Sequence, residues 1–141
     1  MGPFSATVTN PASPTLISPV NNSTVTRSNG MTVTWAGGSG NVQMMVAGGT
    51  DNTYATGATA ICTAPASPGT FTIPPYVLLA LPAPANFVGA PGAGSPGGFV
   101  FSSVPAEVPF TATGLSVGSL STQANSEGFG YGAGTGYFAL K

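Results

Sequence analysis

The sequence contains no histidine and very few charged residues, and this shortage excludes most enzymatic chemistry. Among 141 residues, two are Lys or Arg and three are Asp or Glu, 4% of the chain, whereas charged residues make up about 25% of a typical soluble protein. Serine-type catalysis needs a base beside the nucleophile, and no histidine supplies one. The carboxylates Asp51, Glu107 and Glu127 are scattered through turn-like sequence, so nothing pairs two of them as glycosidases require. We therefore expect no catalytic site.

The same scarcity argues against metal, cofactor and nucleic-acid sites. A structural zinc site is built from Cys and His ligands, and the chain has a single cysteine, Cys62, which we expect to pack as a small hydrophobic residue. The two basic residues cannot neutralise the phosphates that nucleic-acid binding requires. The glycine runs at 36–40 and 128–136 lack the Lys-Ser/Thr pair of a phosphate-binding loop. We expect no metal, no cofactor and no nucleic-acid partner.

Long apolar runs are also missing. No uninterrupted apolar stretch reaches the roughly 18 residues of a membrane-spanning helix, and the closest, residues 73–81, is interrupted by prolines. The opening Met1-Gly2-Pro3-Phe4 lacks the basic start and apolar core of a signal peptide, so secretion is inferred from composition. A net charge of −1 gives copies of the chain little mutual repulsion. These properties favour an extracellular or cell-surface location, with copies of the chain, other surface proteins or glycans as partners.

The chain is rich in glycine, proline and short apolar segments that alternate with Ser and Thr. It has 21 glycines and 14 prolines, and 42% of its residues are hydrophobic. This pattern predicts one all-β domain with many turns. A proline start followed by leucines predicts one short helix near 74–81, and segment 114–120 is expected to continue the preceding strand after a bend. The expected strands lie at 16–17, 31–35, 41–47, within 54–63, and at 71–73, 98–104, 108–113 and in the Gly-rich C-terminal segment.

The pattern is strongest around Trp35, the only tryptophan. Met31, Val33 and Trp35 share one face of an alternating segment, so Trp35 is the expected core anchor. The dipeptide Asn29-Gly30 stands between alternating segments, which is a strong signal for a β-hairpin.

The run Leu16-Ile-Ser-Pro-Val-Asn-Asn-Ser-Thr-Val25, followed by Met31-Thr-Val-Thr-Trp35, resembles the first two strands of bacterial extracellular fibronectin type III or Ig-like modules. The match lies mainly in residues 14–35. It implies an Ig-like (fibronectin type III-like) antiparallel β-sandwich and a spacer, adhesion or assembly role at a cell surface. The chain departs from that family in its Pro-Pro helix, its long 82–98 loop and its glycine-rich tail.

The N-terminal segment has to pair with something. Residues 1–13 are expected to form a strand and a Pro-rich tether ahead of a single domain at 14–141. Phe4, Ala6 and Val8 alternate with Ser and Thr, so segment 4–9 is expected either to join its own domain as an edge strand or to insert into a neighbouring copy.

The C-terminal segment 128–141 is glycine-rich and aromatic, and it has two interpretations. Residues 128–140 form a flat, uncharged edge strand that could pair with another chain. Alternatively, its aromatic side chains stack on sugar rings. The residues of this possible contact surface are Phe129, Tyr131, Tyr137 and Phe138.

Three hypotheses follow from these patterns. The first is a non-catalytic, extracellular structural or adhesive surface module. The second is a self-assembling fibre or filament subunit joined by strand exchange through residues 4–9 or 128–140. The third is a carbohydrate-binding module that uses the aromatic cluster.

Overall fold

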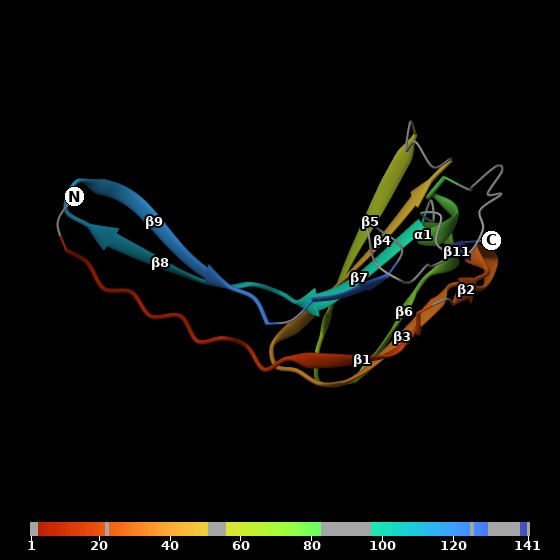
Figure 1. The fold of residues 1–141 in the computed structure, drawn as a ribbon, viewed down its shortest axis with the longest axis horizontal. Helices are drawn as coiled ribbons and strands as arrows, with labels where there is room; N and C mark the ends of the chain where they lie inside the picture. The colour runs from red at the N-terminus through yellow and green to blue at the C-terminus, as the bar shows by residue number, and fades with distance from the viewer. Residues whose placement is uncertain are drawn as a thin grey trace.

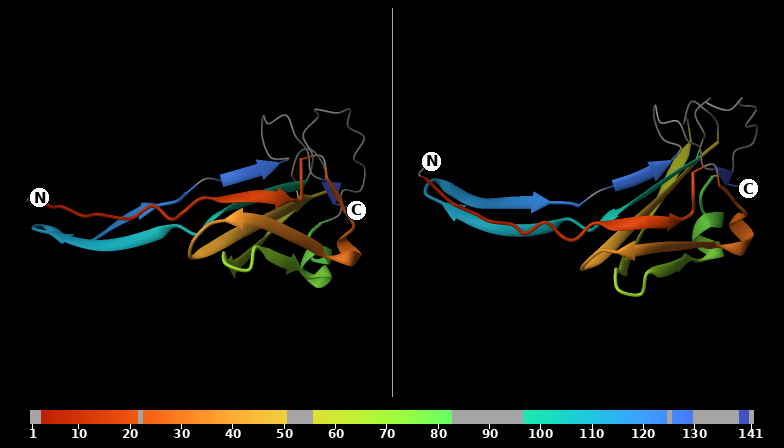
Figure 2. Two further views of the ribbon diagram at one scale, coloured as in Figure 1. Left: turned by 90° about the horizontal axis from the view of Figure 1, so that it is seen from below. Right: turned by 60° about the horizontal axis from the view of Figure 1, so that its bottom comes forward.

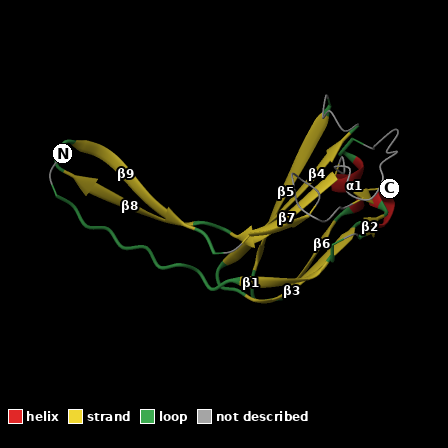
Figure 3. Ribbon diagram, viewed as in Figure 1, coloured by secondary structure: helices red, strands yellow, loops and turns green. Residues whose placement is uncertain are grey.

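The chain folds into a β-sheet body from which a two-stranded arm projects (Figure 1). The computed structural model describes residues 3–21, 23–50, 56–82, 97–124, 126–129 and 139–140. Figure 3 shows that strands dominate and that the helical turns lie at the end of the body away from the arm. The elements are β1 (Pro14–Ser18), β2 (Thr24–Val25), η1 (Arg27–Asn29), β3 (Met31–Gly37), β4 (Asn41–Gly49), β5 (Gly57–Pro65), β6 (Thr70–Ile73), α1 (Pro75–Leu79), β7 (Gly97–Ser103), β8 (Ala106–Ala112), β9 (Leu115–Thr122), β10 (Ser126–Phe129) and β11 (Ala139–Leu140).

Two sheets make up the body. One has the strand order β1-β3-β6 and the other β10-β7-β4-β5, and every pairing within them is antiparallel. The short strands β2 and β11 add a parallel pair beside them. The predicted all-β fold is therefore confirmed, its sheets are mostly antiparallel, and its architecture is sandwich-like (Figures 1 and 2).

The core forms because the central strands of both sheets alternate with period two. Strand β3 buries Met31, Val33 and Trp35 while Thr32 is exposed, as the sequence predicts. Strand β4 buries its own alternate residues in the same cluster, and β7 adds two phenylalanines. These further core residues are Val42, Met44, Val46, Phe99 and Phe101.

Trp35 lies at the centre of this cluster. Its side chain is 3% exposed, and its ring packs against Phe101 of the opposite sheet with centroids 5.6 Å apart. The indole N–H donates to the carbonyl oxygen of Ala66 at 2.8 Å. The only polar atom of this side chain is thus hydrogen-bonded inside the core, which avoids the penalty of an unpaired buried donor.

The hairpin predicted at Asn29-Gly30 is wrong. Asn29 ends the 3₁₀ turn η1, and β3 pairs with β1 and β6 instead of the segment before it. Gly30 has φ 75° and ψ −177°, and a Cβ there would lie 2.8 Å from the carbonyl oxygen of Ile73. Glycine is required here for a close backbone approach to β6, and not for a two-residue turn.

Two further expectations have opposite outcomes. The short helix near 74–81 is confirmed as α1, which has proline in its first turn and buries Leu78. Segment 114–120 does not continue the strand before it. The chain reverses at Gly114, where φ is 83°, and β9 returns alongside β8 as a hairpin.

Two neighbouring methionines on β4 give a matched test of the core. Met44 is fully buried, whereas Met45 points to the other face and is half-buried. Replacing Met44 with Ala should lower the free energy of unfolding by about 2–5 kcal/mol because it leaves a cavity, and Met45→Ala by about 1 kcal/mol or less. Urea denaturation followed by Trp35 fluorescence measures both values. Equal losses would contradict the assigned faces.

Candidate functional site

The arm is the feature that stands apart from the body. Strands β8 and β9 pair with each other and with no other described strand. They lie between β7 and β10 in the sequence, so the arm is an extended connection between two adjacent strands of the four-stranded sheet. Figure 1 shows it reaching away from the body at the left.

The arm has two chemically different faces because its strands also alternate. One face, called the covered face, is half-buried along most of its length. The opposite face, called the open face, carries the exposed residues of β8, which are Glu107, Pro109 and Thr111, with Ser119 and Ser121 across from the first two. The covered face consists of Ala106, Val108, Phe110 and Ala112 on β8, with Leu115, Gly118, Leu120 and Thr122 as their partners on β9.

Residues 3–13, called the N-terminal segment, lie along the covered face. The rings of Phe4 and Phe110 are stacked with centroids 4.7 Å apart and planes 9° from parallel. At the base of the arm the hydroxyl of Thr122 donates to Oδ1 of Asn10 at 2.8 Å. Between these contacts Ala6 and Val8 are half-buried. Both views in Figure 2 show the segment following the arm to its outer end.

This arrangement differs from the expected edge strand. In the described part of the chain, residues 3–13 belong to no β-ladder. Their backbone is held by a hydrogen bond from the amide of Ala12 to Oγ of Ser39 at 2.9 Å. The predicted alternation persists in the burial of Ala6 and Val8, while Phe4 remains 51% exposed. The segment therefore covers a face of the hairpin through side chains and does not extend its sheet.

Gly118 allows the stacked rings to lie where they do. It is paired with Phe110 across the hairpin, and a Cβ at this position would lie 2.5 Å from Cζ of the phenylalanine. The ring thus lies over the glycine backbone, an arrangement that shields a glycine within a strand. Sequence reasoning missed this contact because only the register of β8 against β9 brings the two residues together.

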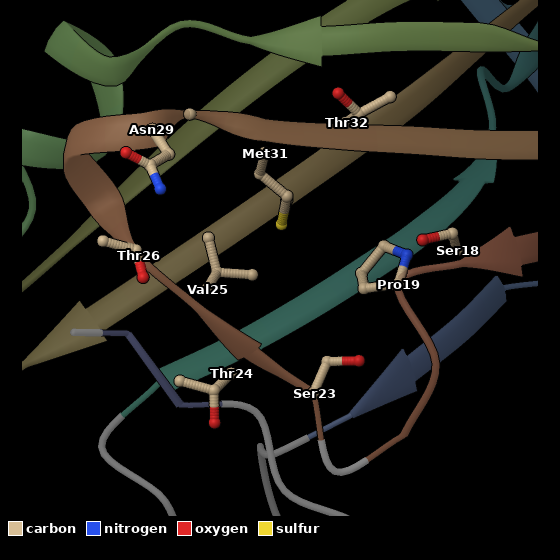
Figure 4. Close-up of a pocket in the computed structure, with 10 residues that line it drawn as sticks. Ser18, Pro19, Ser23, Thr24, Val25, Thr26, Asn29, Met31 and Thr32 are labelled. Atoms are coloured by element: carbon tan, nitrogen blue, oxygen red, sulfur yellow. The ribbon is translucent and has the colours of Figure 1, made fainter.

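A shallow groove of about 340 Å³ lies at the other end of the body, between β1, β2 and the start of β3. Figure 4 shows Val25 and Met31 pointing toward each other, with Thr24 and Thr32 directed away on opposite sides. The hydroxyl of Ser23 already donates to a backbone carbonyl. The polar groups of this groove do not converge on one point, which a ligand-orienting site requires.

The predicted C-terminal contact surface lies mostly outside the described residues. Tyr131, Tyr137 and Phe138 belong to that part, and of Phe129 only the backbone is described, paired with Phe99 in β10. Strand β11 pairs with β2. Both described ends of segment 128–140 are thus held by strands of their own chain.

Within the described part of the chain, the carboxylates lie on different elements. Glu107 is exposed on the arm, the backbone of Glu127 pairs with β7, and Asp51 lies outside the described part. Within the residues that the structure describes, no His, Cys, Asp and Glu side chains form a group of three suited to a metal ion. No helix in the same part has the length and apolar character needed to cross a membrane.

Comparisons with known protein families, with curated proteins and with solved structures find no match to this chain. The site is therefore defined by its own geometry, which singles out the arm and the N-terminal segment.

The stack of Phe4 on Phe110 holds the outer end of the N-terminal segment. Replacing Phe4 with Ala removes a contact worth about 0.5–1.5 kcal/mol and should free residues 5–9 while the body stays folded. Backbone order parameters from NMR should fall below about 0.6 in this segment. Thr7→Ala, on the exposed side of the same segment, is the control and should change nothing. Loss of order in both variants would contradict the proposed contact.

Cys62 lies on β5, packs partly against the core, and its burial raises the pKa of the thiol. The unfolded chain, with a thiol pKa of about 8.5, therefore loses this proton at lower pH than the folded chain does. The contribution of Cys62 to stability is fully present below the thiol pKa of the unfolded chain, and it is lost as pH rises through the thiol pKa of the folded chain. The difference in unfolding free energy between wild type and Cys62→Ala should shrink above about pH 8.5 in urea titrations. A difference that grows with pH would contradict the sign.

Proposed function

We propose that this chain is a non-catalytic structural or adhesive module, extracellular or at a cell surface, with an Ig-like body and the arm as its contact element. The observation that carries the proposal is the arm itself, which presents two backbone edges and an open face away from the body (Figures 1 and 2). A projecting hairpin adds little to a core, so its size is better explained by an external contact.

The strand order supports the Ig-like part of the proposal. In Ig sandwiches, strands A, B and E face strands C, F and G, and variable domains add C′ beside C. Here β1-β3-β6 faces β10-β7-β4-β5, which corresponds to A-B-E against G-F-C-C′. Antibody domains join strands B and F by a disulfide, and the Trp35–Phe101 contact bridges the corresponding strands β3 and β7.

The position of the arm supports the contact role. In that correspondence the arm replaces the loop between F and G, which is one of the binding loops of variable domains. Glu107 is the only charged residue in 105–123, and the N-terminal segment has none. Recognition by this surface would therefore depend on backbone hydrogen bonds and apolar contacts and would vary little with salt.

The second hypothesis, a fibre or filament subunit, is favoured by one observation. The N-terminal segment is held by side-chain contacts and belongs to no described β-ladder. A neighbouring copy could accept the same segment with the same contacts, as in domain swapping. A chain lacking residues 1–10 would then fail to form the polymers that negative-stain imaging reveals for the full chain. The carbohydrate-binding hypothesis stays a prediction from sequence, because most of its residues lie outside the described part.

Removing the arm tests the proposed function. Beads coated with the full chain should be retained on plates of extracellular-matrix protein or on a glycan array. A variant in which Gly-Asn-Gly replaces residues 105–122 keeps Gln123, whose side chain donates to Ser102 and Ser103 of the body. This variant should lose the retention and keep a folded body. Ile61→Ala, a change at an exposed position of β5, is the control and should retain full adhesion. Retention that is absent for the full chain, or unchanged without the arm, would contradict the proposal.

A further inference from the structure

The two outer edges of the arm differ in their capacity to pair with another strand. An exposed strand edge presents unpaired backbone groups, which proteins commonly block with proline or charge. Strand β8 carries both, as Pro109 and Glu107. Strand β9 reads Leu-Ser-Val-Gly-Ser-Leu-Ser-Thr and has neither. Only the outer edge of β9 is left without these protections.

The regular part of this edge is short and well defined. The register shifts between Phe110 and Ala112, which places an extra residue on β9 near the tip. A bulge of this kind disrupts pairing on its own strand, so the pairing-competent run is residues 118–122, opposite 106–110. The N-terminal segment lies on the covered face and is part of no ladder with β9 in the described chain. The edge also stands clear of the body in all three views of Figures 1 and 2.

The chemistry of this edge fits a second copy of the same chain. The occupant of a strand edge is another extended strand, because backbone donors and acceptors alternate along it. In a two-fold symmetric contact the same surface of both copies is used. A charge near the symmetry axis would therefore lie close to the same charge of the other copy. Residues 118–122 carry none. Antiparallel pairing centred on Leu120 places the two Leu120 side chains opposite each other and each Ser119 opposite a Ser121.

We propose that two copies associate through the outer edges of β9 and join their arms into one four-stranded antiparallel sheet, β8-β9-β9-β8. The inference rests on the proposed function, since it takes the arm as the contact element, and it names the partner. Five paired residues bury less than the roughly 1,200 Å² of a stable interface. The association is therefore weak in solution and becomes strong where many copies are held side by side.

A pair of lysine substitutions on the two edges tests this. Ser119→Lys on β9 places two lysines on diagonal positions of the joined sheet, which lie about 7–8 Å apart in the backbone, so their like charges repel each other. Thr111→Lys adds the same charge to the open face of β8, on the far edge. By sedimentation equilibrium from 10 µM to 1 mM of the full chain, we expect dimerisation at least tenfold weaker for Ser119→Lys and within twofold of wild type for Thr111→Lys. A wild-type chain that stays monomeric throughout, or equal losses in both variants, would overturn the proposal.

Cross-linking tests the register and traps even a weakly populated dimer. In a Cys62→Ala background, Leu120→Cys places two thiols opposite each other, with Cα atoms about 4.5–5.5 Å apart, within the range of a disulfide. Val117→Cys is on the same strand, and Val117 is 77% exposed in the wild type. In the proposed pairing its thiol would lie six residues along the strand from the same thiol of the second copy. Diamide should yield covalent dimers of the first variant and not of the second. Equal yields would overturn the register.

The outcomes separate this inference from the proposed function. One outcome is a chain that stays monomeric but still needs the arm for retention on matrix or glycan surfaces. It would overturn the association through β9 and leave the proposed function standing. A chain that dimerises through β9 and is retained on neither surface would support the association through β9 and overturn adhesion to other molecules. Far-UV circular dichroism and the ring-current shifts of Phe4 and Phe110 establish that each variant keeps the folded arm.

Discussion

The contact between Trp35 and Phe101 holds the architecture together. It joins the central strands of two sheets in a chain whose single cysteine allows no internal disulfide, and the indole N–H is satisfied by a backbone carbonyl inside the core. Phe101 lies on β7, the strand that leads into the arm. The strand that supplies half of this core contact is therefore also the strand that carries the chain into the arm.

The arm, unlike the body, buries little apolar surface. The apolar residues of its covered face are at most half-buried, and an isolated two-stranded hairpin is marginally stable in water. The N-terminal segment supplies the missing layer through a ring stack and a side-chain hydrogen bond. Such a layer can open while the body remains folded, because a segment that buries little apolar surface opens at a low cost in free energy. The molecule thus combines a tightly packed body with an arm whose covering layer is held by few contacts.

Sequence patterns predict what depends on local alternation and fail where a distant segment decides. The buried face of β3 and the proline start of α1 followed from spacing alone. Gly30 looked like a turn residue in the sequence. The group that requires a glycine there, the carbonyl of Ile73, lies more than forty residues away along the chain. Segment 4–9 showed that one of its sides must be covered, but its pattern could not say that a hairpin face, and not a sheet edge, would cover it. The stack over Gly118 likewise required the register of β8 against β9.

Scarcity of charge changes how such a surface can be selective. Without charged pairs, specificity has to come from register, and in a strand a shift of one residue moves every side chain to the other face. Around Leu120, serines alternate with the apolar residue. The pairing that sets leucine against leucine keeps the covered faces of both arms on one side of the joined sheet. A one-residue slip would place leucine beside serine and turn the two N-terminal segments to opposite sides. The Ser-Leu-Ser pattern therefore disfavours a one-residue slip without any charge.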